Sequence, residues 1–138
     1  MSSNSDSSIS PLQTALILLL LIGSEEEFWV RLIKDSKYIV STAHDAISAK
    51  QRISYFKFDL IVLDIMMPGK SGLEFIQENK KNLETPVVLL TAKGEPKERI
   101  EGLEIGADDY LPKPFEPKEL ILRIKNILNK TIKTEQVR

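Results

Sequence analysis

The sequence contains no cysteine and only one histidine, and these two absences narrow the possible chemistry. Without cysteine the chain forms no disulfide, builds no thiolate metal site and has no cysteine nucleophile. His44 alone cannot supply a cluster of several histidine ligands, so we interpret it as a loop residue.

Two further features are missing: an excess of charge of one sign and a long hydrophobic run. The 19 basic and 20 acidic residues nearly balance, which does not favour direct binding to nucleic acids. The longest apolar stretch, residues 16–22, is far shorter than the ~20 residues that a membrane-spanning helix needs. The segment before it lacks the basic residues of a signal peptide. We therefore expect a buried strand there, and a soluble cytoplasmic protein without a membrane partner.

The chain length of 138 residues and the hydrophobic content of 42% suit one compact domain. Residues 1–11 are rich in serine and asparagine, so we expect a disordered tail there. We expect the domain over residues 12–130. Residues 131–138 are polar and are expected to form a tail or the start of a linker.

Strand and helix patterns alternate along the domain. The expected strands are 15–22, 38–42, 58–63, 86–90 and 108–112, and the expected helices are 25–35, 45–54, 71–81, 95–105 and 117–130. Ser24 and Glu27 form a capping box, and Pro117 suits a first helical turn. Alternating strands and helices predict a parallel sheet covered on both faces. Pro112 cannot donate to a ladder, so the fifth strand should lie at an edge.

Three polar residues stand where consecutive expected strands end. Asp64 follows an apolar run and precedes the turn Met-Met-Pro-Gly, Thr91 ends a second run, and Lys113 closes a third. Ligands and chemistry gather at the carboxyl edge of open parallel sheets. An acid, a hydroxyl and an ammonium at that edge predict a site that handles a phosphoryl group.

These motifs resemble the receiver domain of bacterial two-component response regulators. The matching segments are FDLIVLDIMMPGKSGLEFI, PVVLLTAKG and GLEIGADDYLPKPFEPKELILRIKNIL, within residues 38–130, and the last is most similar to the winged-helix (OmpR/PhoB-type) branch. The resemblance implies a flavodoxin-like, CheY-like (βα)5 fold, a doubly wound parallel α/β sheet with strand order 2-1-3-4-5. It also implies a signalling module rather than an enzyme.

The resemblance implies roles for individual residues. Asp64 would accept the phosphoryl group from a sensor histidine kinase, Lys113 would offset its charge and Thr91 would bind one of its oxygens. Tyr110 would turn inward when Thr91 moves, and Lys113-Pro114 would be a cis peptide. Met66 would offer its backbone carbonyl to a metal.

The chain departs from the family at the end of its first strand, where receivers carry two adjacent acids that hold Mg²⁺ together with the phosphoacceptor. One alignment places that pair at residues 23–24, which are Gly-Ser, and the other places it at residues 20–21, which are Leu-Leu. Mg²⁺ needs oxygen ligands in near-octahedral array. We therefore expect Mg²⁺ binding at Asp64 to be weak or absent. With fewer competing carboxylates, Lys113 should pair closely with Asp64.

The winged-helix branch dimerises through its fourth helix, fifth strand and fifth helix by means of ion pairs. The residues at matching positions are Arg99 with Glu119, Asp109 with Arg123 and, more loosely, Asp108 with Lys130. The resemblance therefore implies a homodimer through this face, with an effector domain or another protein downstream.

Several functions stay open at this point. Asp64 is phosphorylated despite weak Mg²⁺ binding, or the domain is a phosphorylation-independent interaction module. An aspartate-nucleophile phosphatase would need a second acid two residues after the nucleophile, where Met66 stands. A flavodoxin-like cofactor binder would need a phosphate-binding loop after the first strand, where only Gly-Ser precedes three glutamates.

Overall fold

The computed structural model describes residues 15–20, 26–64, 72–79, 84–91, 100, 103–104 and 106–137, with the backbone alone for 72–73 and 131–137. Its strands are β1 (Leu16–Leu20), β2 (Ile39–Ala43), β3 (Leu60–Asp64), β4 (Val87–Thr91) and β5 (Asp109–Pro112). Its helices are α2 (Glu26–Asp35), α3 (Ala46–Tyr55), α4 (Gly72–Asn79) and α6 (Pro117–Val137).

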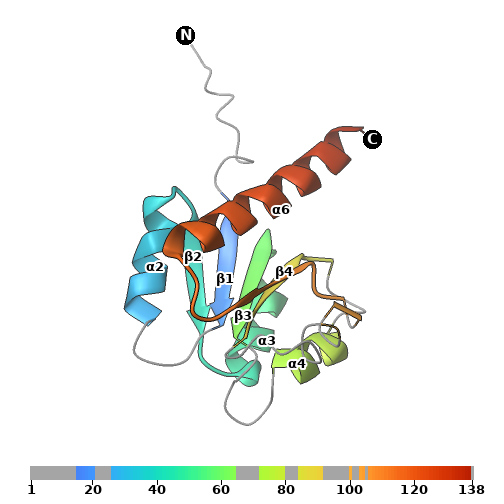
Figure 1. The fold of residues 1–138 in the computed structure, drawn as a ribbon. Coiled ribbons are helices and arrows are strands. Elements are labelled where there is room, and N and C mark those ends of the chain that lie inside the picture. The colour runs from blue at the N-terminus through green and yellow to red at the C-terminus, as the bar shows by residue number, and fades with distance from the viewer. Residues whose placement is uncertain are drawn as a thin grey trace.

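All strands pair in parallel and form one sheet in the order β2-β1-β3-β4-β5 (Figure 1). This confirms the predicted flavodoxin-like α/β fold. β5 lies at an edge, as Pro112 predicts. Proline has no backbone N–H to donate, and an edge strand has no neighbour on its outer side that needs one.

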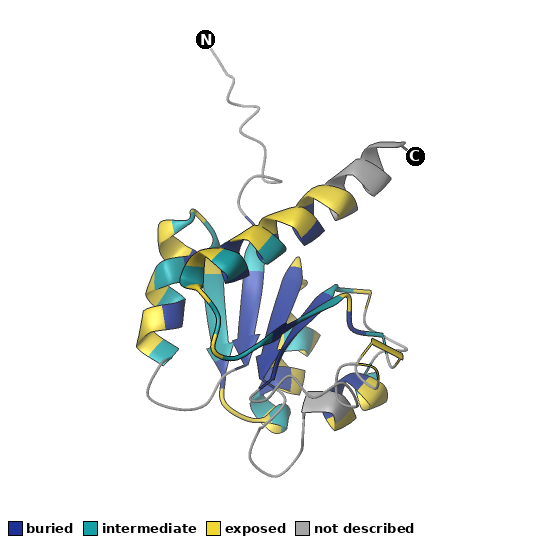
Figure 2. Ribbon diagram, viewed as in Figure 1, coloured by how far each residue is buried: buried dark blue, intermediate teal, exposed yellow. Residues whose placement is uncertain are grey.

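Two layers of helices cover the sheet, and each covers its own hydrophobic core. Alternate side chains of a strand point to opposite faces, so successive residues of β1 serve different cores. Ile17 and Leu19 pack with α2 and α6, whereas Leu18 and Leu20 pack on the side of α3 and α4. Figure 2 shows the result, with the central strands buried and the exposed residues on the outer sides of the helices. The near-continuous apolar runs of the strands are therefore explained by burial on both faces.

Most helices match their predicted ranges within a few residues. Residues 100, 103 and 104 are helical, but the rest of the expected helix 95–105 lies outside the described residues, as do Ser24 of the expected capping box and the expected disordered tail. Pro117 is the first residue of α6, as predicted.

The last helix is longer than predicted. It continues through residues 131–137, where we expected a polar tail or the start of a linker. That stretch contains neither glycine nor proline, so the helix meets none of the usual stop signals there.

Candidate functional site

Three predicted site residues meet at the carboxyl edge of the sheet. The register pairs Asp64 with Leu90 and Thr91 with Pro112, so the ends of β3, β4 and β5 lie side by side. The Lys113 backbone N–H donates to the Thr91 carbonyl at 2.7 Å, which holds Lys113 beside the end of β4. The Lys113-Pro114 peptide is cis, as the resemblance implied.

The central contact of this site is an ion pair. Lys113 Nζ donates to Asp64 Oδ2 at 2.9 Å, with side-chain exposures of 28% for lysine and 6% for aspartate. Asp64 and Thr91 are the two buried polar residues in the described part of the chain. A buried carboxylate is costly without a partner, and the ammonium supplies one. The close pairing expected from the sequence is therefore present.

The described residues at this edge do not fit a magnesium site. Leu20, the last described residue of β1, pairs with Ala43 and Leu63 and is fully buried. A leucine there contributes no oxygen ligand, and Asp64 is already paired with Lys113. Among the described residues, no three histidines, cysteines or acids come together to hold a metal ion. Residues 21–25 and Met66, which belong to the predicted metal site, lie outside the described residues.

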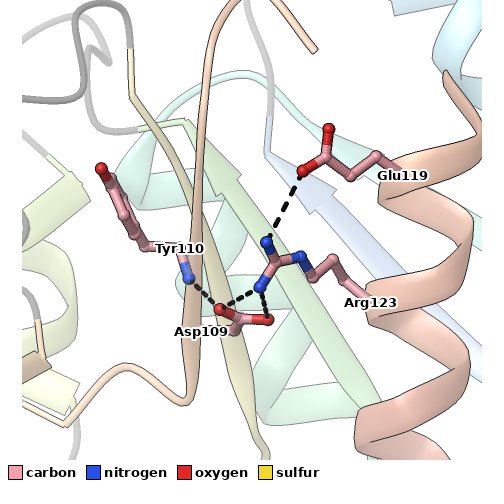
Figure 3. Close-up of polar contacts among 4 residues, drawn as sticks. All are labelled: Asp109, Tyr110, Glu119 and Arg123. Atoms are coloured by element: carbon pink, nitrogen blue, oxygen red, sulfur yellow. Dashed lines mark hydrogen bonds and ion pairs between the residues drawn. The ribbon is translucent and has the colours of Figure 1, made fainter. Parts of the chain in front are cut away.

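Tyr110, the predicted switch residue, is half-buried and packs against the core beneath α3 and α4. Its backbone N–H donates to Asp109 Oδ1 at 2.8 Å (Figure 3). Tyr110 therefore lies between Asp109, where the charged face begins, and Lys113, three positions further along the chain at the carboxyl edge of the sheet.

That charged face is organised by Arg123. Its Nη1 donates to both carboxylate oxygens of Asp109 at 3.0 Å, and its Nη2 lies 3.6 Å from Glu119 Oε2 (Figure 3). The hydrogen bonds to Asp109 raise the pKa of the Arg123 guanidinium above its ordinary value. The surrounding groove between β5 and α6 is lined by Asp108, Asp109, Glu119, Leu122, Arg123, Asn126, Ile127 and Lys130.

Several of the predicted interface residues have contacts within one chain. Asp108 Oδ2 accepts the backbone N–H of Val87 at 2.8 Å, so its carboxylate ties the start of β4 to the loop before β5. Asp109 and Arg123, expected to pair between two copies, pair within one chain. Arg99 lies outside the described residues.

Two contacts near the site were not predicted from the sequence. Trp29 of α2 packs its ring 4.9 Å from that of Phe115, which follows Lys113 by two positions. His44 Nε2 lies 2.7 Å from Glu26 Oε1 and links the loop after β2 to the start of α2. No local signal predicts either contact, because each joins residues that are distant in sequence.

The sequence matches the family described as response regulator receiver domain over residues 26–125. It is 56% identical to Protein PetR of Rhodobacter capsulatus over 108 residues, 78% of this chain and 44% of that protein. It is 50% identical to the phosphate regulon transcriptional regulatory protein PhoB of Escherichia coli over 91 residues, 64% of this chain and 40% of that protein.

The fold resembles the Francisella response regulator 1452 receiver domain with a TM-score of 0.81 and 32% identity, over 86% of this chain and 99% of that chain. The chain spans about half the length of the curated relatives it matches. Among the described residues, none of the helices has the length and apolarity that crossing a bilayer requires.

Proposed function

The chain belongs to the family of response regulator receiver domains, and from this premise we propose that Asp64 is its phosphoacceptor. The supporting observation is the buried Asp64–Lys113 ion pair at the end of β3. A carboxylate there is shielded from most of the solvent yet lies at the sheet edge where ligands bind.

The proposed reaction is transfer from a phosphohistidine of a sensor kinase. An Asp64 carboxylate oxygen attacks phosphorus, a P–O bond forms and the P–N bond breaks. The histidine imidazole leaves with the electron pair and takes up a proton. Positioning and charge neutralisation carry most of the catalysis in phosphoryl transfer, and Lys113 supplies a positive charge at 2.9 Å from Asp64. The Thr91 hydroxyl, at the end of the neighbouring strand, would bind a phosphoryl oxygen.

The proposed output is homodimerisation through the face formed by β5 and α6, which we call the β5–α6 face: Asp108, Asp109, Glu119, Arg123 and Lys130. Arg123 forms in-chain contacts with Asp109 and Glu119, and ion pairs of the same residue types could form between copies. Exposed ion pairs are worth about 0–1 kcal/mol each, so they would fix the register of a dimer more than its affinity. Tyr110 links this face to the phosphoacceptor edge by its position between Asp109 and Lys113.

Several curated relatives, PhoB among them, are named as transcriptional regulatory proteins, and the match to this chain covers about half of their length. We infer that the domain works with an effector domain that controls transcription, and that the kinase, a second copy and this effector are its partners.

One observation favours a second candidate, a phosphorylation-independent interaction module. Leu20 occupies the end of β1, where one alignment with the family places a metal-binding acid. Without that acid, Mg²⁺ would bind weakly and phosphorylation would be slow. In this alternative the Lys113–Asp64 pair holds the site in a fixed state and dimerisation needs no phosphate.

Binding of beryllofluoride with Mg²⁺ distinguishes the phosphoacceptor proposal from the interaction module. Trp29 fluorescence measures the binding, and sedimentation measures the dimer fraction. Trp29 contacts Phe115 beside the site, so a change there should alter its emission. The phosphoacceptor proposal predicts a saturable response and a larger dimer fraction in wild type, and neither in Asp64→Asn. A wild-type protein that dimerises without responding would support the interaction module instead. Titration with Mg²⁺ alone then gives the metal affinity of each protein.

A further inference from the structure

The two edges of the sheet are protected differently. Edge strands expose unpaired backbone groups, and proteins commonly block them with charges or proline. β5 carries both, in Asp109 and Pro112. β2, at the opposite edge, reads Ile-Val-Ser-Thr-Ala and carries neither. Figure 2 shows β2 mostly only partly buried, beside β1, which is buried from Ile17 to Leu20. Among the described strands, β2 is therefore the edge that is open to pairing.

The backbone of β2 presents its outward groups at two residues. The Ile39 N–H donates to the Ala15 carbonyl at 2.9 Å, so Ile39 directs its backbone toward β1. In a parallel ladder, successive residues direct their N–H and C=O groups to opposite sides. Val40 and Thr42 therefore direct theirs away from the sheet. Both residues have high strand propensity, which suits them to accept a further strand.

A groove of about 640 Å³ runs between this edge and α2, and it is lined by Val40, Thr42, Glu26, Glu27, Val30, Arg31, Lys34 and Asp35. The His44–Glu26 contact places the start of α2 near the end of β2. The helix thus runs opposite to the strand. Glu27 lies toward the end of β2, and Lys34 lies one helix length away, toward its start.

We propose that a second copy of this chain occupies the groove by antiparallel pairing of β2 with β2, around a two-fold axis at Ser41. Val40 of each copy then lies opposite Thr42 of the other. Val40 and Thr42 both direct their backbone groups outward. Each Val40–Thr42 pair across the axis is therefore a hydrogen-bonded pair, in which the two residues exchange both N–H···O=C bonds. Ser41 meets its own equivalent on the axis, so the sheets of the two copies become continuous.

The charges of the groove argue for a second copy rather than an unrelated strand. The same two-fold axis brings the two α2 helices together in antiparallel orientation. Glu27 of one copy then faces Lys34 of the other, and the contact occurs twice. A C2 interface must be self-complementary in this way. Glu26, which lies opposite Asp35 of the other copy, is already in contact with the His44 ring. This interface lies at the opposite edge from the β5–α6 face, so it goes beyond the proposed function and does not compete with it.

Sedimentation equilibrium of the whole chain in an Arg123→Ala background tests the proposal, because that background weakens association through the β5–α6 face. Thr42→Pro removes one outward N–H but leaves the ladder to β1 intact. We expect it to raise the dimer dissociation constant about tenfold or more, equivalent to ~1.4 kcal/mol. Thr42→Val keeps the N–H and should associate like its parent. A parent that stays monomeric, or a Thr42→Pro protein that associates equally well, would overturn the proposal.

A charge exchange tests the register. Glu27→Lys and Lys34→Glu should each weaken association, since each places like charges opposite one another. The double variant restores the pair with its charges reversed and should recover association to within a few-fold of its parent. Failure of the double variant to recover, in a protein whose circular dichroism is unchanged, would contradict the proposed pairing.

Discussion

Lys113 reaches across the end of β4 to place its ammonium 2.9 Å from the carboxylate of Asp64, which ends β3. The two residues are 49 positions apart in sequence, and the parallel register of β3, β4 and β5 brings them together. The pair joins a nearly buried acid to a base that is partly exposed. Because the two side chains differ in burial, loss of Lys113 and loss of the Asp64 charge should change the free energy of unfolding by different amounts.

Removing Lys113 should destabilise the fold more than neutralising Asp64. Lys113→Met removes the ammonium from the buried Asp64 carboxylate, and removing one partner of a buried ion pair costs on the order of a few kcal/mol. Asp64→Asn leaves Lys113, whose side chain is 28% exposed and can turn to water. Urea unfolding of both variants measures the difference in the free energy of unfolding.

The double variant completes this comparison. Once Asp64 is neutral, loss of Lys113 should cost less, so the two effects should not add. Equal costs for the two single variants together with full additivity would show that the ion pair contributes little to the site.

Arg123→Ala should affect association more than stability. Its partners Asp109 and Glu119 are partly exposed, and exposed ion pairs contribute about 0–1 kcal/mol to folding. Lys125→Ala is a matched control on the same helix, because Lys125 is exposed but does not line the β5–α6 groove. Thermal unfolding and sedimentation of both variants test this. Equal dimer fractions in the two would argue against dimerisation through this face.

Asp45 should stabilise α3 in a pH-dependent way. Its carboxylate accepts hydrogen bonds from the Ser48 hydroxyl at 2.6 Å and backbone N–H at 2.8 Å, and these bonds lower the pKa of Asp45 below 3.8. A lowered pKa in the folded state gives stability above the ordinary value, which disappears as pH falls through the folded pKa.

At neutral pH, Asp45→Ala should therefore lower the midpoint of thermal unfolding, and Asp45→Asn should lower it less, because asparagine also caps helices but lacks the charge. The gap between wild type and Asp45→Ala should narrow at pH values well below 3.8. A gap that is independent of pH would mean that the charge plays no part in the cap.

Trp29 carries a buried Nε1 with no hydrogen-bond partner in the described part of the chain. Such a donor costs about 1–3 kcal/mol, which Trp29→Phe would remove while leaving a small cavity. The two effects oppose one another, so the free energy of unfolding should change by about 1 kcal/mol or less. Trp29→Ala should instead cost about 3–5 kcal/mol. Urea unfolding that shows similar losses for both variants would reveal a partner for the indole N–H.

The three central strands could be predicted from sequence because each is a short, nearly continuous apolar run, and those of β3 and β4 end in a polar residue. Asp64 and Thr91 mark such ends, and the same pattern gives their common position at the carboxyl edge. Pro112 predicted the edge position of β5 because proline lacks the ladder donor. The end of α6 was missed, since polar composition alone does not stop a helix in the absence of glycine or proline.

Contacts between exposed charged side chains could not be predicted in the same way. The motif pairs Asp109 with Arg123, but it does not say whether the pair forms within a chain or between chains, and the structure places it within one. The His44–Glu26 contact depends on the relative position of α2 and the loop after β2, which no local pattern encodes. Hydrophobic periodicity fixes the faces of helices, but it does not fix which charged groups meet.

The central claim, that Asp64 accepts a phosphoryl group, is tested most directly by intact-mass spectrometry after incubation with acetyl phosphate and Mg²⁺. We predict that wild type gains the mass of one phosphoryl group and loses it again in mild base, as an acyl phosphate does. Asp64→Asn should gain nothing, and Lys113→Ala should gain less than wild type. A wild type that stays unmodified, or an Asp64→Asn protein that is modified equally, would contradict the claim.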